Sequence, residues 1–323
     1  MLKHKKVLVT GGAGFIGSHI VDELVKRDCE TTVLDIFSEN SLKNLEQNRD
    51  SITLVNGSII NKKLVKENIS MDVIFHEAAC NLTASMREPA NALMVNTIGT
   101  LNILESMKEK SAETVLVHGS TGSVYGQSLY SPQDEKHPCN PTNPYAISKY
   151  AAERYVTFFS QQYALKTVCL RYYNVIGRGQ NFRTDGGLVS NFIMRVLGGE
   201  PPLVEGDGTQ KRCFTSVEDV VRANILAYGA EKSYGLTFNI AGEETTTINE
   251  LASLICSFSK KPLKPMHIKP RGREIYDFEP SIALAREVLG YAPKRRLKDV
   301  IPDLMRWIKS ELQSEQMSRR KEK

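Results

Sequence analysis

The segment at residues 10–17, with the sequence TGGAGFIG, constrains the fold of this chain more than any other stretch. It follows the apolar run Val7–Val9 and opens into an amphipathic stretch at 18–26, an order that predicts strand, tight turn and helix. Glycines in such a turn let the backbone bend sharply and approach a pyrophosphate, whose charge lies on the helix N-terminus. Glycine-rich turns are common, but the flanking strand and helix favour a dinucleotide-binding site.

A carboxylate at the expected distance supports this interpretation. Asp35 ends a second apolar run at 31–34, where it can accept hydrogen bonds from the adenosine ribose hydroxyls. No Arg or Lys follows before Lys43, so no nearby cation in the sequence would neutralise a 2′-phosphate. Both features favour NAD over NADP as the cofactor. For Asp35 itself, the alternative is an ordinary solvated Asp at a strand end.

Composition limits the function classes. At 323 residues the chain can form one large domain or a large and a small one, and its small formal charge of +5 is dispersed, so we expect no nucleic-acid partner. The six cysteines form no CxxC pair and the six histidines no HExxH motif, so we predict neither a disulfide framework nor a metal site. This pattern fits a reducing, cytoplasmic location. The basic start leads into a run too short for a signal sequence, and no window is long enough to span a membrane, so we expect no membrane partner.

Short apolar runs alternate with helical patterns along the first half of the chain. The expected strands lie at 7–10, 32–35, 53–55, 73–76, 115–118 and 167–171, and long helical patterns lie at 91–110 and 145–163. This alternation predicts an α/β fold, a doubly wound parallel sheet of the Rossmann type. Residues 1–174 form the predicted NAD-binding domain, to which we expect 214–241 to return. Residues 175–323 form mainly a smaller C-terminal substrate-binding cap domain.

Two segments place reactive side chains near the predicted cofactor site. Tyr145 and Lys149 lie four residues apart at the start of a predicted helix, so they share one face. A neighbouring ammonium would lower the Tyr pKa toward the range of a general base, although this spacing is also common by chance. The segment GSTGSVYG at 119–126 puts hydroxyl groups at the carboxyl edge of the sheet, as reaction partners or as an ordinary turn.

Taken in order, these motifs resemble those of the extended short-chain dehydrogenase/reductases that act on nucleotide sugars as epimerases and dehydratases. The resemblance covers nearly the whole chain. It rests on TGGAGFIGSH at the start, HEAA at 76–79, VNTIGTLNILE at 95–105, STGSVYG at 120–126, PYAISK at 144–149, RYYNVIG at 171–177 and GDGTQKRCFTSVEDVV at 206–221.

The resemblance implies roles for individual residues. Tyr145 would remove the proton from the sugar 4′-hydroxyl while hydride passes to NAD, Lys149 would hold the nicotinamide ribose and lower the Tyr145 pKa, and Thr121 would hydrogen-bond O4′. The implied cofactor contacts are Gly11, Gly14, Phe15, Ile16, Gly17, Asp35, Ser58, Ile59, Ala78, Ala79, Tyr145 and Lys149. The implied substrate contacts, among which guanidinium groups suit a diphosphate, are Ser85, Thr121, Ser123, Asn174, Arg212, Arg271 and Phe278.

Departures from the family pattern bear on the reaction. The dehydratases carry an Asp-Glu pair after the catalytic Thr and the decarboxylases a Glu, whereas this chain has Gly and Ser at 122 and 123. Water elimination would then need another acid, such as Glu77 or Asp185. Uronate-acting members place an Arg where this chain has Gly179. Arg178 precedes it by one residue, so uronates are disfavoured while the shifted Arg keeps them open.

The predicted function is an NAD-dependent epimerase that inverts C4 of a nucleotide-activated hexose, with a UDP-sugar as the expected substrate, through a 4-keto sugar. The alternatives are a dehydratase or decarboxylase that begins with the same oxidation, and a non-catalytic NAD-binding sensor. A bulky Phe278 would narrow the pocket at the sugar 2-substituent and favour a plain hexose over an N-acetylated one, unless it is core packing. By analogy with the family, the helices at 91–110 and 145–163 pair two subunits in a homodimer.

Overall fold

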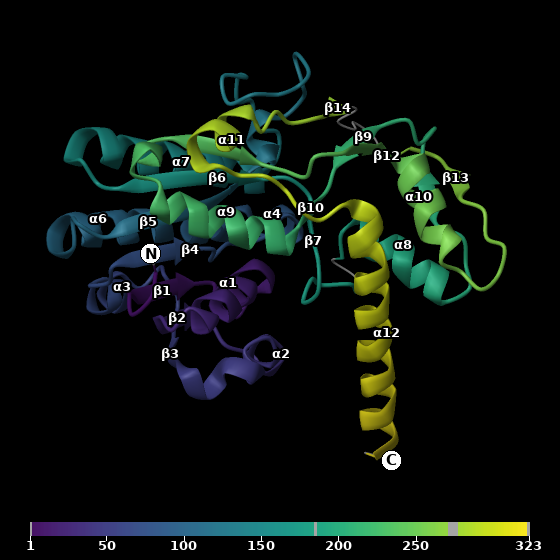
Figure 1. Cartoon of the computed structure of the whole chain (residues 1–323), viewed down its shortest axis with the longest axis horizontal. Helices are drawn as coiled ribbons and strands as arrows, with labels where there is room; N and C mark the ends of the chain where they lie inside the picture. The colour runs from purple at the N-terminus through teal and green to yellow at the C-terminus, as the bar shows by residue number, and fades with distance from the viewer. Residues whose placement is uncertain (1, 184–185, 271–276, 322–323) are drawn as a thin grey trace.

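The computed structural model describes residues 2–183, 186–270 and 277–321, and its larger part is built on a parallel sheet of seven strands (Figure 1). The strand order is β11-β6-β5-β4-β1-β2-β3. The chain order reverses between β1 and β4, and in open sheets of this kind ligands bind beyond the strand ends at such a point. The strands are β1 Lys6–Thr10, β2 Glu30–Asp35, β3 Ile52–Asn56, β4 Val73–His76, β5 Val115–Thr121, β6 Thr167–Tyr172 and β11 Thr237–Ile240.

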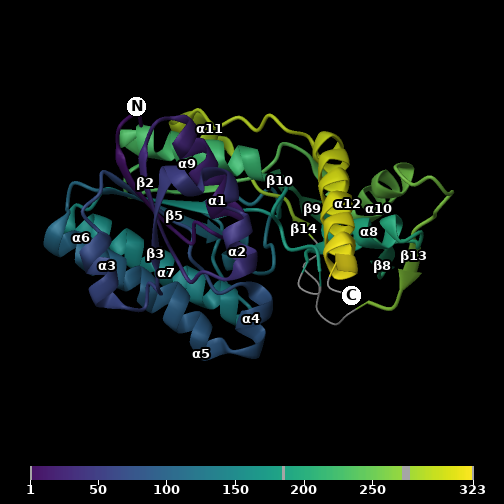
Figure 2. The same cartoon turned by 90° about the horizontal axis from the view of Figure 1, so that it is seen from below.

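Helices cover both faces of this sheet, as Figure 2 shows. One face carries α1 (Phe15–Lys26) and α9 (Val217–Gly229), and the other carries α3 (Lys62–Asn68), α6 (Thr100–Lys110) and α7 (Pro144–Tyr163). Strand residues such as Val7 and Ile74 are fully buried because they lie between two helical layers. The predicted α/β fold with a doubly wound Rossmann sheet is therefore confirmed.

The smaller part has an apolar core of its own, which includes Phe192, Leu251 and Ile301. Its elements lie to the right of the main sheet in Figure 1, beyond the carboxyl ends of the strands. They are α8 (Leu188–Leu197), β8 (Leu203–Glu205), β9 (Lys211–Cys213), β12 (Thr245–Thr247), α10 (Ile248–Ser257), β13 (Met266–Ile268), β14 (Asp277–Phe278) and α12 (Leu297–Lys321). None of the helices in the described part of the chain is both long and apolar enough to cross a membrane.

Segments after residue 174 are divided between the two parts. α9 packs on α1, and β11 pairs with β6 in parallel register, Phe238 opposite Leu170. The short helix α11 (Ala283–Leu289) also packs on β11, and Leu289 belongs to the core of the main sheet. We therefore propose a boundary near residue 174 that the chain crosses more than once.

The remaining short elements are α2 (Glu39–Lys43), η1 (Glu46–Ser51), α4 (Leu82–Arg87), α5 (Pro89–Ala92), η2 (Leu93–Gly99), η3 (Gly122–Tyr125), β7 (Val175–Ile176), β10 (Thr215–Ser216) and η4 (Glu231–Ser233).

A buried ion pair fixes α7 against the sheet. The Arg171 Nε atom donates to Glu153 Oε2 at 3.0 Å, and its Nη2 atom donates to Glu153 Oε1, so the contact is bidentate. The Ser120 hydroxyl donates to the same carboxylate at 3.0 Å, and Arg171 Nη1 donates to the Tyr125 hydroxyl at 2.6 Å. Because Arg171 lies on β6, Ser120 on β5 and Glu153 on α7, the pair sets the position of α7 across two strands.

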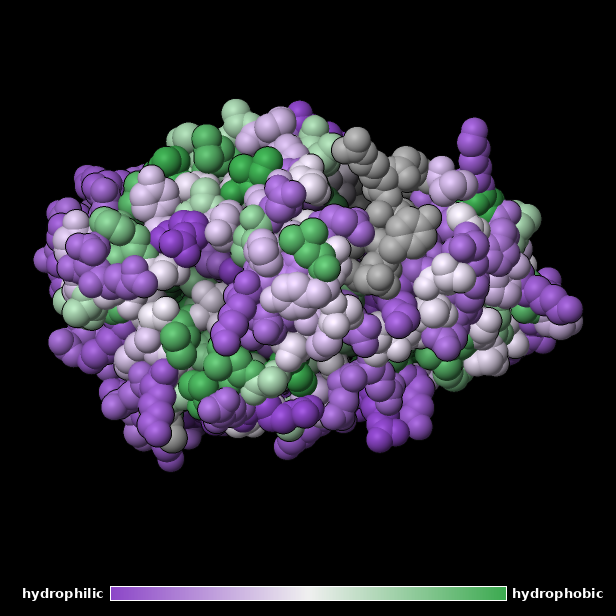
Figure 3. Space-filling view, turned by 90° about the horizontal axis from the view of Figure 1, so that it is seen from above, coloured by the Kyte–Doolittle hydropathy of each residue, from purple (hydrophilic) through white to green (hydrophobic). Residues whose placement is uncertain are grey.

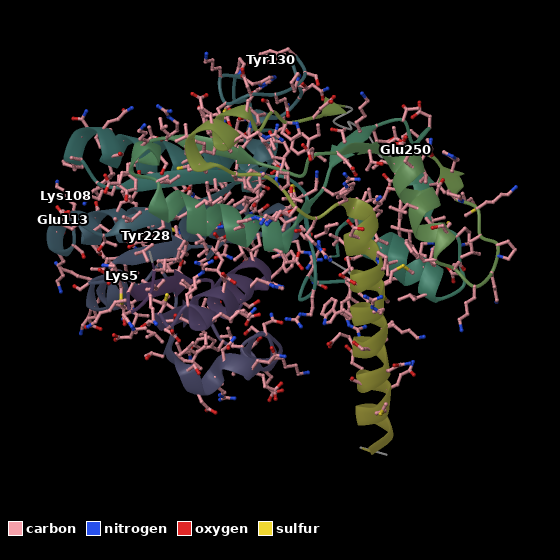
Figure 4. The ribbon with its side chains drawn as sticks, viewed as in Figure 1. Lys5, Lys108, Glu113, Tyr130, Tyr228 and Glu250 are labelled. Carbon is pink, nitrogen blue, oxygen red and sulfur yellow. The ribbon has the colours of Figure 1, made fainter. Side chains whose placement is uncertain are left out.

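Exposed ion pairs at the amino-end edge of the sheet offer a contrast. Lys166 Nζ lies 2.6 Å from Glu113 Oε2, and Lys5 Nζ lies 3.0 Å from Asp72 Oδ1. Figure 4 shows Lys5 and Glu113 at the end of the molecule that is remote from the smaller part. Such solvated pairs contribute little to stability because water screens both charges.

The two pairs give a matched test of burial. We expect Arg171→Met to lower the free energy of unfolding by about 3–5 kcal/mol, because it leaves the Glu153 carboxylate buried and unpaired. Lys166→Met, which breaks the exposed pair, should cost less than about 1 kcal/mol. Urea denaturation followed by circular dichroism measures both. Equal losses in the two variants would contradict the assignment of Arg171–Glu153 as the contact that fixes α7.

Candidate active site

A cavity of about 230 Å³ lies at the carboxyl ends of β1, β2, β3 and β4, at the point where the strand order reverses. Most of the predicted cofactor contacts line it, namely Gly11, Gly14, Asp35, Ser58, Ile59, Ala78 and Ala79. We call this cavity the cofactor groove. Residues 15–17 form the first turn of α1 beside it.

The glycine turn is shaped for close approach of a ligand. Gly11 has φ of +71°, a left-handed conformation, and a Cβ atom there would lie 2.5 Å from the Ala78 nitrogen. At Gly17 a Cβ would lie 2.2 Å from the Gly11 carbonyl oxygen, so only glycine lets α1 start this close to the turn. The N-cap of α1 is Gly14, which has no side chain to cap the helix, so its first N–H groups suit a pyrophosphate.

Asp35 closes the end of the groove that we assign to the adenosine. Its carboxylate accepts hydrogen bonds from the backbone nitrogens of Ala13 at 2.8 Å and Ile36 at 2.7 Å. Burial raises the pKa of Asp35, and these two hydrogen bonds oppose the shift. A carboxylate fixed in this way can accept from ribose hydroxyls and would repel a 2′-phosphate. The residues present therefore fit NAD.

The predicted catalytic residues come together at the start of α7. Asn143 caps this helix by accepting a hydrogen bond from the Ala146 nitrogen at 2.9 Å, and Pro144 occupies its first turn. The Tyr145 hydroxyl lies close enough to that of Thr121, the last residue of β5, for Thr121 to lower the Tyr145 pKa. Lys149 follows one turn later and is only 3% exposed.

Burial dominates the electrostatics of this trio. It raises the pKa of Tyr145 to about 12, and the Glu77 carboxylate adds to the shift while the Thr121 hydrogen bond opposes it. Burial also lowers the pKa of Lys149 to about 8, against the attraction of Glu77. Lys149 is not among the groups that shift the Tyr145 pKa, whose net direction is upward because burial outweighs the other influences. That Lys149 lowers this pKa in the NAD complex stays a prediction.

Glu77 is a site residue whose position the sequence did not give. It follows the last residue of β4, lines the cofactor groove and accepts a hydrogen bond from the Tyr172 hydroxyl at 2.7 Å. Its position directly after a buried strand could have indicated that it lies at the carboxyl edge of the sheet. No sequence motif indicated that it contacts Tyr172.

Asn96 is a second residue with a role that sequence reasoning missed. Its side chain accepts from the Cys80 nitrogen at 2.7 Å and donates to the Cys80 carbonyl at 3.1 Å and to the Ser148 hydroxyl at 2.9 Å. It thereby joins the loop after β4 to α7. The predicted helix at 91–110 is interrupted here, because η2, which contains Asn96, is a wider π-helical turn.

The expected substrate contacts lie in several environments. Ser85 is fully buried and donates to the Leu82 carbonyl at 2.7 Å, whereas Ser123 shares hydrogen bonds with Thr121. The Asn174 side chain donates to the Cys213 carbonyl at 2.8 Å. Arg212 on β9 is paired in register with Phe278 on β14, and Arg271 lies outside the described residues.

Arg178 lies at a different cavity. A space of about 990 Å³ between α1, α9 and α12 is lined by Arg178 together with His19 and Trp307, and Arg178 Nη2 lies 3.8 Å from Asp22 Oδ2. This cavity is larger than the cofactor groove, but the glycine turn and the carboxylates Asp35 and Glu77 line the groove and not this cavity. The groove therefore has the chemistry that suits a dinucleotide.

The sequence and the fold of this chain are similar to those of known proteins. The model of the NAD dependent epimerase/dehydratase family matches residues 7–241. A relative from Methanocaldococcus jannaschii, provisionally named a UDP-glucose 4-epimerase, is 36% identical over 94% of this chain and 98% of its own length. A UDP-N-acetyl-alpha-D-glucosaminuronate decarboxylase from Bacillus cytotoxicus is 31% identical over 94% and 98%. The crystal structure of UDP-glucose 4-epimerase with UDP-glucose from Thermotoga maritima matches with a TM-score of 0.88 at 33% identity and covers 95% of this chain and 99% of that one.

The glycine turn generates a test of the cofactor groove. We expect Gly11→Ala to weaken NAD binding at least about tenfold, because the strain of a left-handed alanine costs of order 1–3 kcal/mol and its methyl group meets Ala78. Gly198→Ala is the control, since Gly198 has an ordinary negative φ at the end of α8. NAD retained per chain after gel filtration, together with a titration of the stripped protein, measures both. Unchanged NAD binding in Gly11→Ala would remove this turn from the site.

Proposed function

Since the chain belongs to the NAD dependent epimerase/dehydratase family, we propose that it inverts C4 of a nucleotide-activated hexose, with a UDP-hexose as the substrate. The observation that carries the proposal is that Tyr145 lies close to Thr121 and one helical turn from Lys149. Glu77, which lines the cofactor groove, interacts electrostatically with both Tyr145 and Lys149 and so links them to the groove. This arrangement supplies a proton acceptor for a sugar hydroxyl next to the place where hydride is exchanged.

The chemistry divides between the bound cofactor and the side chains. When bound, NAD supplies the hydride acceptor and donor, and its cationic ring favours the Tyr145 phenolate. Tyr145 takes the proton of the 4-hydroxyl as the C4 hydrogen leaves as hydride, so that a 4-keto sugar forms. Thr121 orients O4 through its hydroxyl, and Lys149 holds the cofactor ribose. Return of hydride to the other face of the turned keto sugar would invert C4, and Tyr145 would then give the proton back to O4.

Lyase chemistry is the alternative that the decarboxylase among the relatives brings forward. The residues directly after Thr121 carry no carboxylate, and the Ser123 hydroxyl lies 3.2 Å from that of Thr121. Arg178, which would bind the carboxylate of a uronate, instead faces Asp22 at the other cavity. Both observations favour epimerisation.

Tyr145 provides the mutational test of the mechanism. We expect Tyr145→Phe to lower kcat by about two to four powers of ten, because a general base is removed, while NAD stays bound. Tyr130→Phe is the control, since Tyr130, labelled in Figure 4, is exposed and its hydroxyl donates to the Asp134 carboxylate at 2.7 Å. Coupled assays of sugar conversion and the bound NAD content measure the outcome. Near-normal epimerisation by Tyr145→Phe would overturn the mechanism.

Product analysis separates the reaction classes. Incubation with UDP-glucose, UDP-N-acetylglucosamine, UDP-glucuronic acid and dTDP-glucose, followed by NMR, should give C4 epimers without loss of water or carbon dioxide. The position of Phe278 bears on which hexose is accepted. Its ring is buried in the core of the larger part and packs on Tyr173 with 4.7 Å between centroids, which favours the core-packing alternative. The specificity constants of the unmodified protein for UDP-glucose and UDP-N-acetylglucosamine measure directly which hexose it prefers.

We also propose that the protein is a homodimer. Ile147, Tyr155 and Phe158 are 51%, 41% and 47% exposed and share one face of α7. Leu93 and Met94 of the adjoining η2 are 50% and 41% exposed. Figure 3 shows hydrophobic side chains gathered along its upper left edge, on the side of the larger part. An exposed patch of this kind is typical of a subunit interface.

This face predicts the effect of a charge. Phe158→Glu should give a monomer by size-exclusion chromatography with light scattering, because a carboxylate would be desolvated at the interface. Leu129→Glu is the control, since Leu129 is 73% exposed but lies on a loop outside this face. If Ile147→Glu and Phe158→Glu both keep the dimer, the proposed interface is wrong.

A further inference from the structure

Glu77 is a carboxylate in the cofactor groove that the proposed proton and hydride transfers do not use. It lies directly after β4, at the reversal of the strand order, and lines the groove together with Gly11 and Ala78. Asp35 and Ser58 line another part of the same groove, where we place the adenosine. The opposite end of a dinucleotide then extends toward Glu77, Tyr145 and Lys149.

Three elements hold the Glu77 carboxylate in place. From β6, the Tyr172 hydroxyl donates to Oε1 at 2.7 Å. From α9, Asn224 Nδ2 donates to the Tyr172 hydroxyl at 2.9 Å and so orients it. From β5, Gly119 leaves the space for the carboxylate, since a Cβ there would lie 2.6 Å from Oε2. A side chain this constrained presents its charge at a fixed point.

The groups around Glu77 divide clearly by charge. Burial raises its own pKa to about 7, and Tyr172 and Lys149 oppose the shift. His76 and His118 stay neutral, because burial and the Lys149 charge lower the pKa of each. The raised pKa values of Tyr145 and Tyr172 keep both protonated. Among these groups, Glu77 and Lys149 are the ones that change charge near neutral pH.

We propose that Glu77 sets the balance between the oxidised and reduced forms of the resident nicotinamide. Reduction converts a cationic ring to a neutral one by adding a hydride, that is, one proton and two electrons. A carboxylate held nearby stabilises the cation and therefore favours the oxidised form. An enzyme that must begin each turnover with oxidised NAD benefits, because a lost keto sugar would leave the cofactor reduced. Glu77 would thus act on the cofactor through its charge alone.

This inference rests on NAD binding and not on the identity of the sugar, so it can fail independently of the proposed function. The test equilibrates the NAD-loaded protein, without sugar, against a redox dye under anaerobic conditions and reads the absorbance of bound dihydronicotinamide. At a fixed dye potential and a pH above 7, we expect Glu77→Gln to raise the ratio of bound NADH to bound NAD at least about tenfold. This is the effect of removing one nearby charge in the effective dielectric of a protein.

The pH dependence separates charge from structure. The difference between the unmodified protein and Glu77→Gln should shrink below pH 7, because Glu77 is then protonated and neutral, like the Gln side chain that replaces it. Glu135→Gln is the control, since Glu135 is a partly buried carboxylate that accepts from the Asn239 nitrogen at 2.8 Å outside the groove. It should leave the ratio unchanged. An unchanged ratio in Glu77→Gln above pH 7 overturns the proposal.

A second variant keeps the test decisive if Glu77→Gln does not fold or loses NAD. Tyr172→Phe removes a hydrogen bond that lowers the Glu77 pKa, so the pH at which the ratio changes should move upward. The unmodified protein itself should take up an additional proton on reduction around pH 7, beyond the one that reduction consumes. Absence of this additional proton uptake, or no movement in Tyr172→Phe, also overturns the proposal.

Discussion

The bidentate contact between Arg171 and Glu153 is the interaction on which the site depends most. Both side chains are almost fully buried, so each charge would carry a large desolvation cost without the other. The pair joins β6 to α7, and Ser120 on β5 completes it. Because Lys149 lies one turn before Glu153 and Tyr145 one turn earlier still, the same contact positions the face of α7 that carries the proposed catalytic residues.

The network around this pair reaches further than one helix. Tyr125 accepts from Arg171 and donates to Asn239 of β11 at 2.8 Å. Asn239 in turn donates to the carbonyls of Gln133 and Ser281, each at 3.1 Å. Segments far apart in the chain therefore meet in the network around the Arg171–Glu153 pair. Satisfied polar groups of this kind specify one arrangement, because any alternative leaves a buried donor or acceptor unpaired.

Burial is the second constraint on the chemistry. It raises the Tyr145 pKa and lowers that of Lys149, so both shifts favour the uncharged form of the side chain. If Tyr145 acts as the proposed general base, it needs a change of local charge to become active, which a bound cationic cofactor ring would supply. Glu77 opposes that change at Tyr145 while it stabilises the cation. The Glu77 carboxylate would therefore stabilise the cofactor cation and at the same time disfavour the Tyr145 phenolate.

The sequence by itself determined the sheet type, the cofactor turn and the pairing of Tyr145 with Lys149, because each depends on short-range spacing. Alternating strands and helices require parallel pairing, and a helix brings residues four apart onto one face. Only the tertiary structure decided the direction of the Tyr145 pKa shift, the turn of Arg178 toward Asp22 and the placing of Glu77 against Tyr172. Glu77 and Tyr172 are separated by 95 residues, and burial depends on every element that packs around a group. Such long-range contacts leave no periodic pattern in the chain, so no local spacing could reveal them.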